Sequence, residues 1–169
     1  PMGLIRAHMN KIEFSEDSGS DLANAIITTD TLLKQKAVSI DVGGSTVTIG
    51  GISKGSGMIH PNMATMLAFM STDANVEQEF LSVTLSEAVN ISFNLVSVDT
   101  DQSTNDTCIL MANGAAGNAE IAAGTPEGEL FAAAVTDVAT HLAREMARDG
   151  EGATKLIEST VTGAHTVED

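Results

Sequence analysis

Apolar positions along the chain recur with two periods, one typical of strands and the other typical of helices. Residues alternate between apolar and polar over 38–42 and again over 46–49, and Gly43-Gly44 separates the two stretches. This pattern predicts a β-hairpin with a two-residue turn. Three further stretches predict additional strands; they are Met66–Met70, Thr107–Ala112 and Thr154–Gly163.

Helical spacing predicts two long amphipathic helices. The first starts near Glu77, and its apolar positions are Leu81, Leu85, Ala88 and Val89. The second follows Thr125-Pro126, a cap and a first-turn proline, and ends at Asp149-Gly150. Its apolar stripe is Leu130, Ala134, Val138, Leu142 and Met146. A shorter helix through 22–26 follows the capping pair Ser20-Asp21. Strands interleaved with helices predict an α/β fold in which β-sheets are covered by helices.

Composition restricts the partners and the compartment. The chain has 169 residues, of which 8 are basic and 23 acidic, and its formal net charge is −15. This charge repels phosphate backbones and anionic membranes, so we expect neither nucleic acid nor a membrane as a partner. The start of the chain lacks the features of a signal peptide, and no apolar run could span a bilayer. A single cysteine, Cys108, and the lack of ligand spacings predict a reduced, cytoplasmic protein without a metal or another cofactor.

A glycine-rich loop directly precedes one of the predicted strands, in the segment SKGSGMIHPNMATMLAFMSTDA (Ser53–Ala74). The loop matches neither the Walker nor the dinucleotide-binding pattern. Thr65 stands where loop and strand meet. If the chain is cut between Ala64 and Thr65, the new α-amine can deprotonate the hydroxyl of the same residue, and the strand holds that hydroxyl still. On this pattern alone, a purely structural threonine is the commoner interpretation.

Five segments in order carry a more specific signal. They are AIITTDT (25–31), KGSGMIHPNMATML (54–67), SVDTDQSTNDT (97–107), ANGAAGN (112–118) and DGEGATKLIE (149–158). Together they resemble the ornithine acetyltransferase family, the bifunctional glutamate N-acetyltransferases of arginine biosynthesis. The resemblance implies a sandwich fold like that of the self-cleaving aminopeptidases. It also implies a break that makes 1–64 the end of a first subunit and 65–169 the start of a second, joined as a hetero-oligomer.

The resemblance also implies a reaction and a set of site residues. Thr65 would accept an acetyl group from N-acetylornithine and pass it to glutamate, and acetyl-CoA as a second donor stays open. Thr28, Lys54, Thr65 and Glu151 would contact substrate, with Asn105 and Asp106 organising the site. Physically, Lys54 supplies a cation for a carboxylate, and Glu151 an anion for an amino group. Without the family, Lys54 fits a solvated lysine, Glu151 a residue after a helix end, and Thr28 a capping hydroxyl.

Departures from the family pattern keep two other interpretations open. Family members are longer, and their Thr-Gly oxyanion hole and a further substrate segment would fall outside 1–169. The family more usually has Gly at the place of Thr100 and Thr at that of Gln102. The alternatives are a self-cleaving amidohydrolase or aminopeptidase with water as acceptor, and a truncated, inactive subunit. His60 and Cys108 are assigned no catalytic role, because the α-amine supplies the base and Cys108 fits a buried strand.

Overall fold

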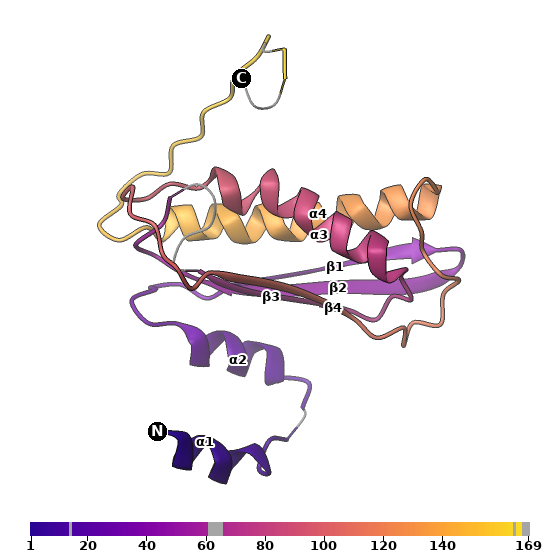
Figure 1. Ribbon diagram of the computed structural model, residues 1–169, viewed down its shortest axis with the longest axis horizontal. Coiled ribbons are helices and arrows are strands. Elements are labelled where there is room, and N and C mark those ends of the chain that lie inside the picture. The colour runs from indigo at the N-terminus through magenta and orange to yellow at the C-terminus, as the bar shows by residue number, and fades with distance from the viewer. Residues whose placement is uncertain (14, 61–65, 164, 167–169) are drawn as a thin grey trace.

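The computed structural model describes residues 1–13, 15–60, 66–163 and 165–166 (Figure 1). Ala64 and Thr65, the expected cleavage pair, lie outside the described residues. In chain order the elements are α1 (Met2–Met9), α2 (Ser18–Ile26), β1 (Lys34–Val42), β2 (Ser45–Lys54), β3 (Leu67–Thr72), α3 (Gln78–Asn90), the 3₁₀ turn η1 (Phe93–Leu95), β4 (Thr107–Ala112) and α4 (Pro126–Arg148).

The described strands form one sheet in the order β1-β2-β3-β4. β1 and β2 are antiparallel, as are β2 and β3, whereas β3 and β4 are parallel. Figure 1 shows α3 and α4 side by side on one face of the sheet, with α2 and then α1 on the other side. The predicted α/β class, with a sheet covered by helices, is confirmed.

The β1–β2 hairpin follows from its turn residues. Gly43 and Gly44 have φ angles of 61° and 89°, the left-handed conformation that both central residues of a type I′ turn require. The pairing of Val42 with Ser45 sets the register, which runs on to Lys34 and Ser53 at the far end. The hairpin predicted from the sequence is therefore present, and β1 and β2 both extend to the opposite end of the sheet.

Helix α4 supplies more buried residues to the apolar core than any other described element. Thr125 caps its start, because the Thr125 side chain accepts a hydrogen bond from the Gly128 amide at 3.0 Å, as the sequence predicts. The residues that α4 buries are Phe131, Ala134, Val135, Val138, Ala139, Leu142, Ala143 and Met146. They pack with β-strand residues that include Val47, Ile49, Ala68 and Met70.

The predicted stripe of α4 is wrong at its first position. Leu130 is 42% exposed, whereas the neighbouring Phe131 is fully buried. Each i+4 step overshoots one helical turn of 3.6 residues by about 40°. Positions taken every four residues back from Met146 therefore shift steadily around the helix. By the first turn of α4 they no longer lie on the buried face.

Two other expectations differ from the structure. Residues 154–163 form no strand, although their β-branched composition predicted one, and the sheet pairs β4 only with β3. Conversely, α1 (Met2–Met9) was not predicted from the sequence; it buries no side chain. Over the part of the chain that the structure describes, none of the helices has the length and apolar character needed to cross a membrane.

Candidate active site

Three segments that carry expected site residues meet at one end of the sheet. Thr28 follows α2 and is exposed, while Lys54 is the last residue of β2 and half-buried. Glu151 lies two residues beyond Asp149, the C-cap of α4, and is also exposed. We call the meeting point of residues 28–32, 55–57 and 149–151 the loop junction.

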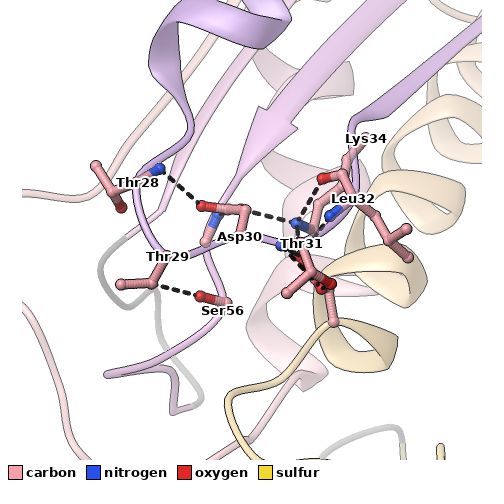
Figure 2. Close-up of polar contacts among 9 residues, drawn as sticks. Thr28, Thr29, Asp30, Thr31, Leu32, Lys34 and Ser56 are labelled. Carbon is pink, nitrogen blue, oxygen red and sulfur yellow. Dashed lines mark hydrogen bonds and ion pairs between the residues drawn. The ribbon is translucent and has the colours of Figure 1, made fainter.

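Hydrogen bonds tie the three segments of the loop junction together (Figure 2). Asp30 accepts from the amide of Gly55, the residue after Lys54, at 2.6 Å, and from the amide of Thr28 at 3.2 Å. The hydroxyls of Thr29 and Ser56 are 2.7 Å apart. The Ser56 carbonyl accepts from the Glu151 amide at 2.6 Å. Hydrogen bonds therefore link the three backbone segments that carry or adjoin Thr28, Lys54 and Glu151.

A buried ion cluster joins Asp30 and Asp149 of the loop junction to Lys34, the first residue of β1. Lys34 Nζ is 2.7 Å from Asp30 Oδ1 and 2.6 Å from Asp149 Oδ2, and the Lys34 side chain is 0% exposed. Burial alone would raise the pKa of each carboxyl. The Gly55 and Thr28 amides and Lys34 outweigh this for Asp30 and hold its pKa below the ordinary value. Lys34 and Thr31 do the same for the pKa of Asp149.

The Glu151 carboxylate lies against the glycine-rich loop. A Cβ atom placed on Gly57 would be 2.8 Å from Glu151 Oε2, so only a glycine leaves the Glu151 carboxylate its present space; Asp99 Oδ2, at 3.6 Å, would be in ordinary contact. Asp99 accepts from the amides of Met58 at 2.5 Å and Ile59 at 3.0 Å. These contacts hold the loop in a shape that includes a left-handed residue, Met58, with a φ of 56°.

The strand that follows the expected cleavage pair starts beside Lys54. In the sheet register Lys54 pairs with Leu67, and Leu67 with Thr107. Asp106 Oδ1 accepts from the Met66 amide at 2.8 Å. Burial raises the pKa of Asp106, although this Met66 contact and the positive charge of Lys54 oppose the rise. Asp106 therefore holds the backbone of Met66, while the organising role expected for it stays a prediction.

His60 and Cys108 were assigned no catalytic role, and their surroundings in the structure are as follows. His60 Nδ1 is 3.4 Å from Ser97 Oγ, at the long end of hydrogen-bond distance. Burial raises the pKa of the Cys108 thiol to about 11, so this thiol is protonated at neutral pH. Within the described ranges, His, Cys, Asp and Glu side chains form no group of three or more that could hold a metal ion.

Sequence reasoning missed the ion cluster. Asp30 was noted only within the segment AIITTDT that carries the resemblance, and Asp149 only as a helix end and as the start of the segment DGEGATKLIE. The local signal available was the spacing of Asp30 and Lys34, four residues apart. That spacing is common among solvated pairs, so it could not reveal burial.

Comparison with known proteins identifies the family. The sequence pattern of the ArgJ family matches residues 1–169. The chain belongs to the ArgJ family. The family membership predicted from the five sequence segments is thereby confirmed.

Curated relatives share the name "Arginine biosynthesis bifunctional protein ArgJ". The protein of Symbiobacterium thermophilum is 56% identical over 155 residues, 92% of this chain and 39% of its own length. That of Lactococcus lactis is 50% identical over 164 residues, 97% of this chain and 41% of its own length. A crystal structure of the Bacillus halodurans protein of the same name has 41% sequence identity and a TM-score of 0.48, covering 50% of this chain and 39% of that chain. This ArgJ-family chain thus spans about two fifths of the length of the curated relatives it matches.

Proposed function

We propose that this chain carries the nucleophile and part of the substrate site of a glutamate N-acetyltransferase of arginine biosynthesis. The enzyme moves an acetyl group from N-acetylornithine to glutamate in the cytoplasm, after self-cleavage between Ala64 and Thr65. The relatives' printed name, which refers to arginine biosynthesis, supports this proposal. The observation that carries it is the loop junction, which links the backbones of Thr28, Lys54 and Glu151.

The proposed maturation is an acyl shift followed by hydrolysis. The Thr65 hydroxyl attacks the Ala64 carbonyl, the peptide C–N bond breaks, and the acyl group passes to the Thr65 oxygen. The hydroxyl proton passes to the departing nitrogen, which becomes the free α-amine of Thr65. Water then hydrolyses the ester, which leaves 1–64 in one subunit with a terminal carboxylate and restores the Thr65 hydroxyl in the other. Asp106, through the Met66 amide at 2.8 Å, keeps the following residue in place during both steps.

The proposed transfer uses the freed α-amine as base. This amine takes the Thr65 hydroxyl proton while the oxygen attacks the acetyl carbon of N-acetylornithine. The C–N bond breaks, and ornithine leaves with the proton. Glutamate then attacks the acetyl-Thr65 ester through its neutral amine, the C–O bond breaks, and the hydroxyl recovers a proton. Lys54 attracts the substrate carboxylate, and Glu151 attracts an amino group.

Intact mass of the full-length precursor tests the first half of the proposal. The wild-type precursor should separate at Ala64-Thr65 without added protease, and Thr65→Ala should remain one chain. Cleavage of Thr65→Ala at the same bond would remove Thr65 as the nucleophile. A wild-type precursor that stays intact would favour the inactive-subunit alternative.

Kinetics and peptide mass spectrometry test the second half. A covalent acetyl-Thr65 predicts parallel double-reciprocal lines for acetylornithine and glutamate. It also predicts one added acetyl group on the peptide that starts at Thr65 when acetylornithine is supplied alone. Intersecting lines without an acetylated peptide would exclude the mechanism. Acetate released equally fast with and without glutamate would favour the hydrolase. Whether acetyl-CoA also donates is measured in the same assay.

Matched charge removals test the two substrate residues. Lys54→Ala and Glu151→Ala should cleave normally and raise the Michaelis constants of the amino-acid substrates by about tenfold or more. Lys36→Ala, the control for Lys54→Ala, removes the same positive charge from a partly exposed ion pair with Asp137 and should leave these constants unchanged. Unchanged constants in the Lys54 and Glu151 variants would take both residues out of the site.

A further inference from the structure

The ion cluster of Asp30, Lys34 and Asp149 uses every donor of its lysine. An ammonium group has three N–H donors, and Lys34 Nζ contacts Asp30 Oδ1 at 2.7 Å, Asp149 Oδ2 at 2.6 Å and the Leu32 carbonyl at 3.3 Å. The side chains of Lys34, Asp30 and Asp149 are 0%, 0% and 2% exposed. Such complete pairing is what a buried charge requires to remain charged.

The carboxylates of Asp30 and Asp149 also accept hydrogen bonds from backbone amides. Asp30 holds the amides of Thr28 and Gly55, at 3.2 and 2.6 Å. Asp149 holds the amides of Thr31 at 2.9 Å and Leu32 at 3.3 Å, and it accepts from the Thr31 hydroxyl. Figure 2 shows the labelled chain from Thr28 to Lys34 curled around these contacts, with Ser56 beside Thr29.

The ion cluster reaches all three segments that carry residues of the proposed site. Thr28 is itself a partner of Asp30, Gly55 directly follows Lys54, and Asp149 lies two positions before Glu151. Removing the Lys34 charge would leave two buried carboxylates without their shared cation, and these carboxylates would move apart or take up water or protons. The three segments would then lose their common anchor.

We propose that Lys34 is a positioning residue, which through Asp30 and Asp149 fixes Thr28, Lys54 and Glu151 relative to one another. The inference rests on the proposed function for the identity of the site, while the coupling of the three segments stands on the contacts alone. Site residues held by packed and hydrogen-bonded neighbours keep the geometry that substrate binding needs. Lys34 is too deeply buried to contact substrate itself.

The matched variants are Lys34→Met and Lys36→Met in the full-length protein. Both remove a β1 lysine that pairs with an aspartate of the α4 segment or its cap, but the Lys36–Asp137 side chains are 26% and 55% exposed. Lys34→Met should raise the Michaelis constants of acetylornithine and glutamate at least tenfold, with a smaller change in kcat. Lys36→Met should change neither. Unchanged Michaelis constants in folded Lys34→Met would overturn the inference.

Amide hydrogen exchange separates positioning from a merely structural role. In Lys34→Met, lower global stability should accelerate exchange in all elements, and exchange should accelerate at least tenfold more in peptides covering 28–32, 55–57 and 149–151 than in α3. An equal acceleration in α3 would mean a general loss of stability and would overturn the inference. If Lys34→Met does not fold, Asp149→Asn, which keeps the side-chain volume, undergoes the same comparison.

The two proposals fail in different ways. A wild-type protein that transfers no acetyl group would sink the proposed function, while the exchange experiment would still decide whether Lys34 couples the three segments. If the wild-type protein transfers acetyl normally, and Lys34→Met and Asp149→Asn both keep wild-type Michaelis constants and wild-type amide exchange, only the positioning role is contradicted.

Discussion

The apolar core beneath α4 and the ion cluster at the loop junction are equally buried, but they are held together by different interactions. Between α4 and the sheet, side chains such as Leu142, Phe131 and Ile49 are fully buried and apolar. At the loop junction, Lys34 is just as buried, yet its contacts are ionic. Apolar packing depends chiefly on volume, which several residue types can supply. A buried ion cluster depends on particular atoms at hydrogen-bond distance, so shape alone cannot replace it.

The largest contrast should come from placing the same residue in both regions. Lys34→Met should lower the free energy of unfolding by about 3–5 kcal/mol, because it strands two buried carboxylates. Leu142→Met conserves volume and should cost less than about 1.5 kcal/mol. Urea unfolding of the purified full-length variants measures both values. Equal losses would show that the ion cluster adds nothing to ordinary packing.

Acid should weaken the loop junction selectively. The pKa values of Asp30 and Asp149 are lowered from the ordinary 3.8, so their contribution to stability is fully present above pH 3.8. It is lost as the pH falls through their folded-state pKa values, below 3.8. The double variant Asp30→Asn/Asp149→Asn lacks this pH-dependent contribution to stability. Its stability deficit relative to wild type, measured by urea unfolding from pH 7 down to about pH 3, should shrink below pH 3.8. A constant deficit contradicts the assignment.

A glycine in each region gives the next contrast. A Cβ on Gly51 would lie 2.8 Å from Val138 Cγ1 and 2.9 Å from Met70 Cγ, so Gly51→Ala overpacks the core and should cost about 1–3 kcal/mol. On Gly57 the near contact is the movable end of Glu151. Gly57→Ala should therefore cost under about 0.5 kcal/mol.

The Gly57 substitution should act on substrate binding instead of folding. Displacing the Glu151 carboxylate should raise the Michaelis constants of the amino-acid substrates, whereas folded Gly51→Ala should keep them. Steady-state kinetics beside the unfolding curves checks both statements. A Gly57→Ala enzyme with wild-type constants would argue that the present position of Glu151 is not the one that binds.

One substitution beside the loop junction should instead increase stability. Met58 and Thr100 are the only described non-glycine residues with positive φ, 56° and 66°, and both flank the Asp99 contacts beside the loop junction. Thr100→Gly relieves the strain of a β-branched residue there and should add about 0.5–1 kcal/mol after the entropy cost of glycine. Thermal unfolding measures it; a lower midpoint would mean that Thr100 makes a compensating contact.

The sequence alone determined the features that depend on neighbouring residues. Gly43-Gly44 specified the hairpin turn and Thr125-Pro126 the start of α4, because turns and caps are set within a few residues. Family membership was equally readable, since five ordered segments carry it. The site residues Thr28, Lys54 and Glu151 came from that resemblance, and their roles remain predictions. The predicted pair Ala64-Thr65 falls outside the described residues.

Only the tertiary structure decided the features that depend on distant partners. A strand needs a neighbouring strand to pair with, and residues 154–163 have none in the sheet. The strand predicted from their composition therefore does not form. The rotation of α4 about its axis, set by its packing on the sheet, decided that Phe131 and not Leu130 is buried. Above all, Lys34 meets Asp149 across 115 positions of sequence. Burial can favour an ion pair only after folding has excluded water from around it, and no local pattern of residues records where that will happen.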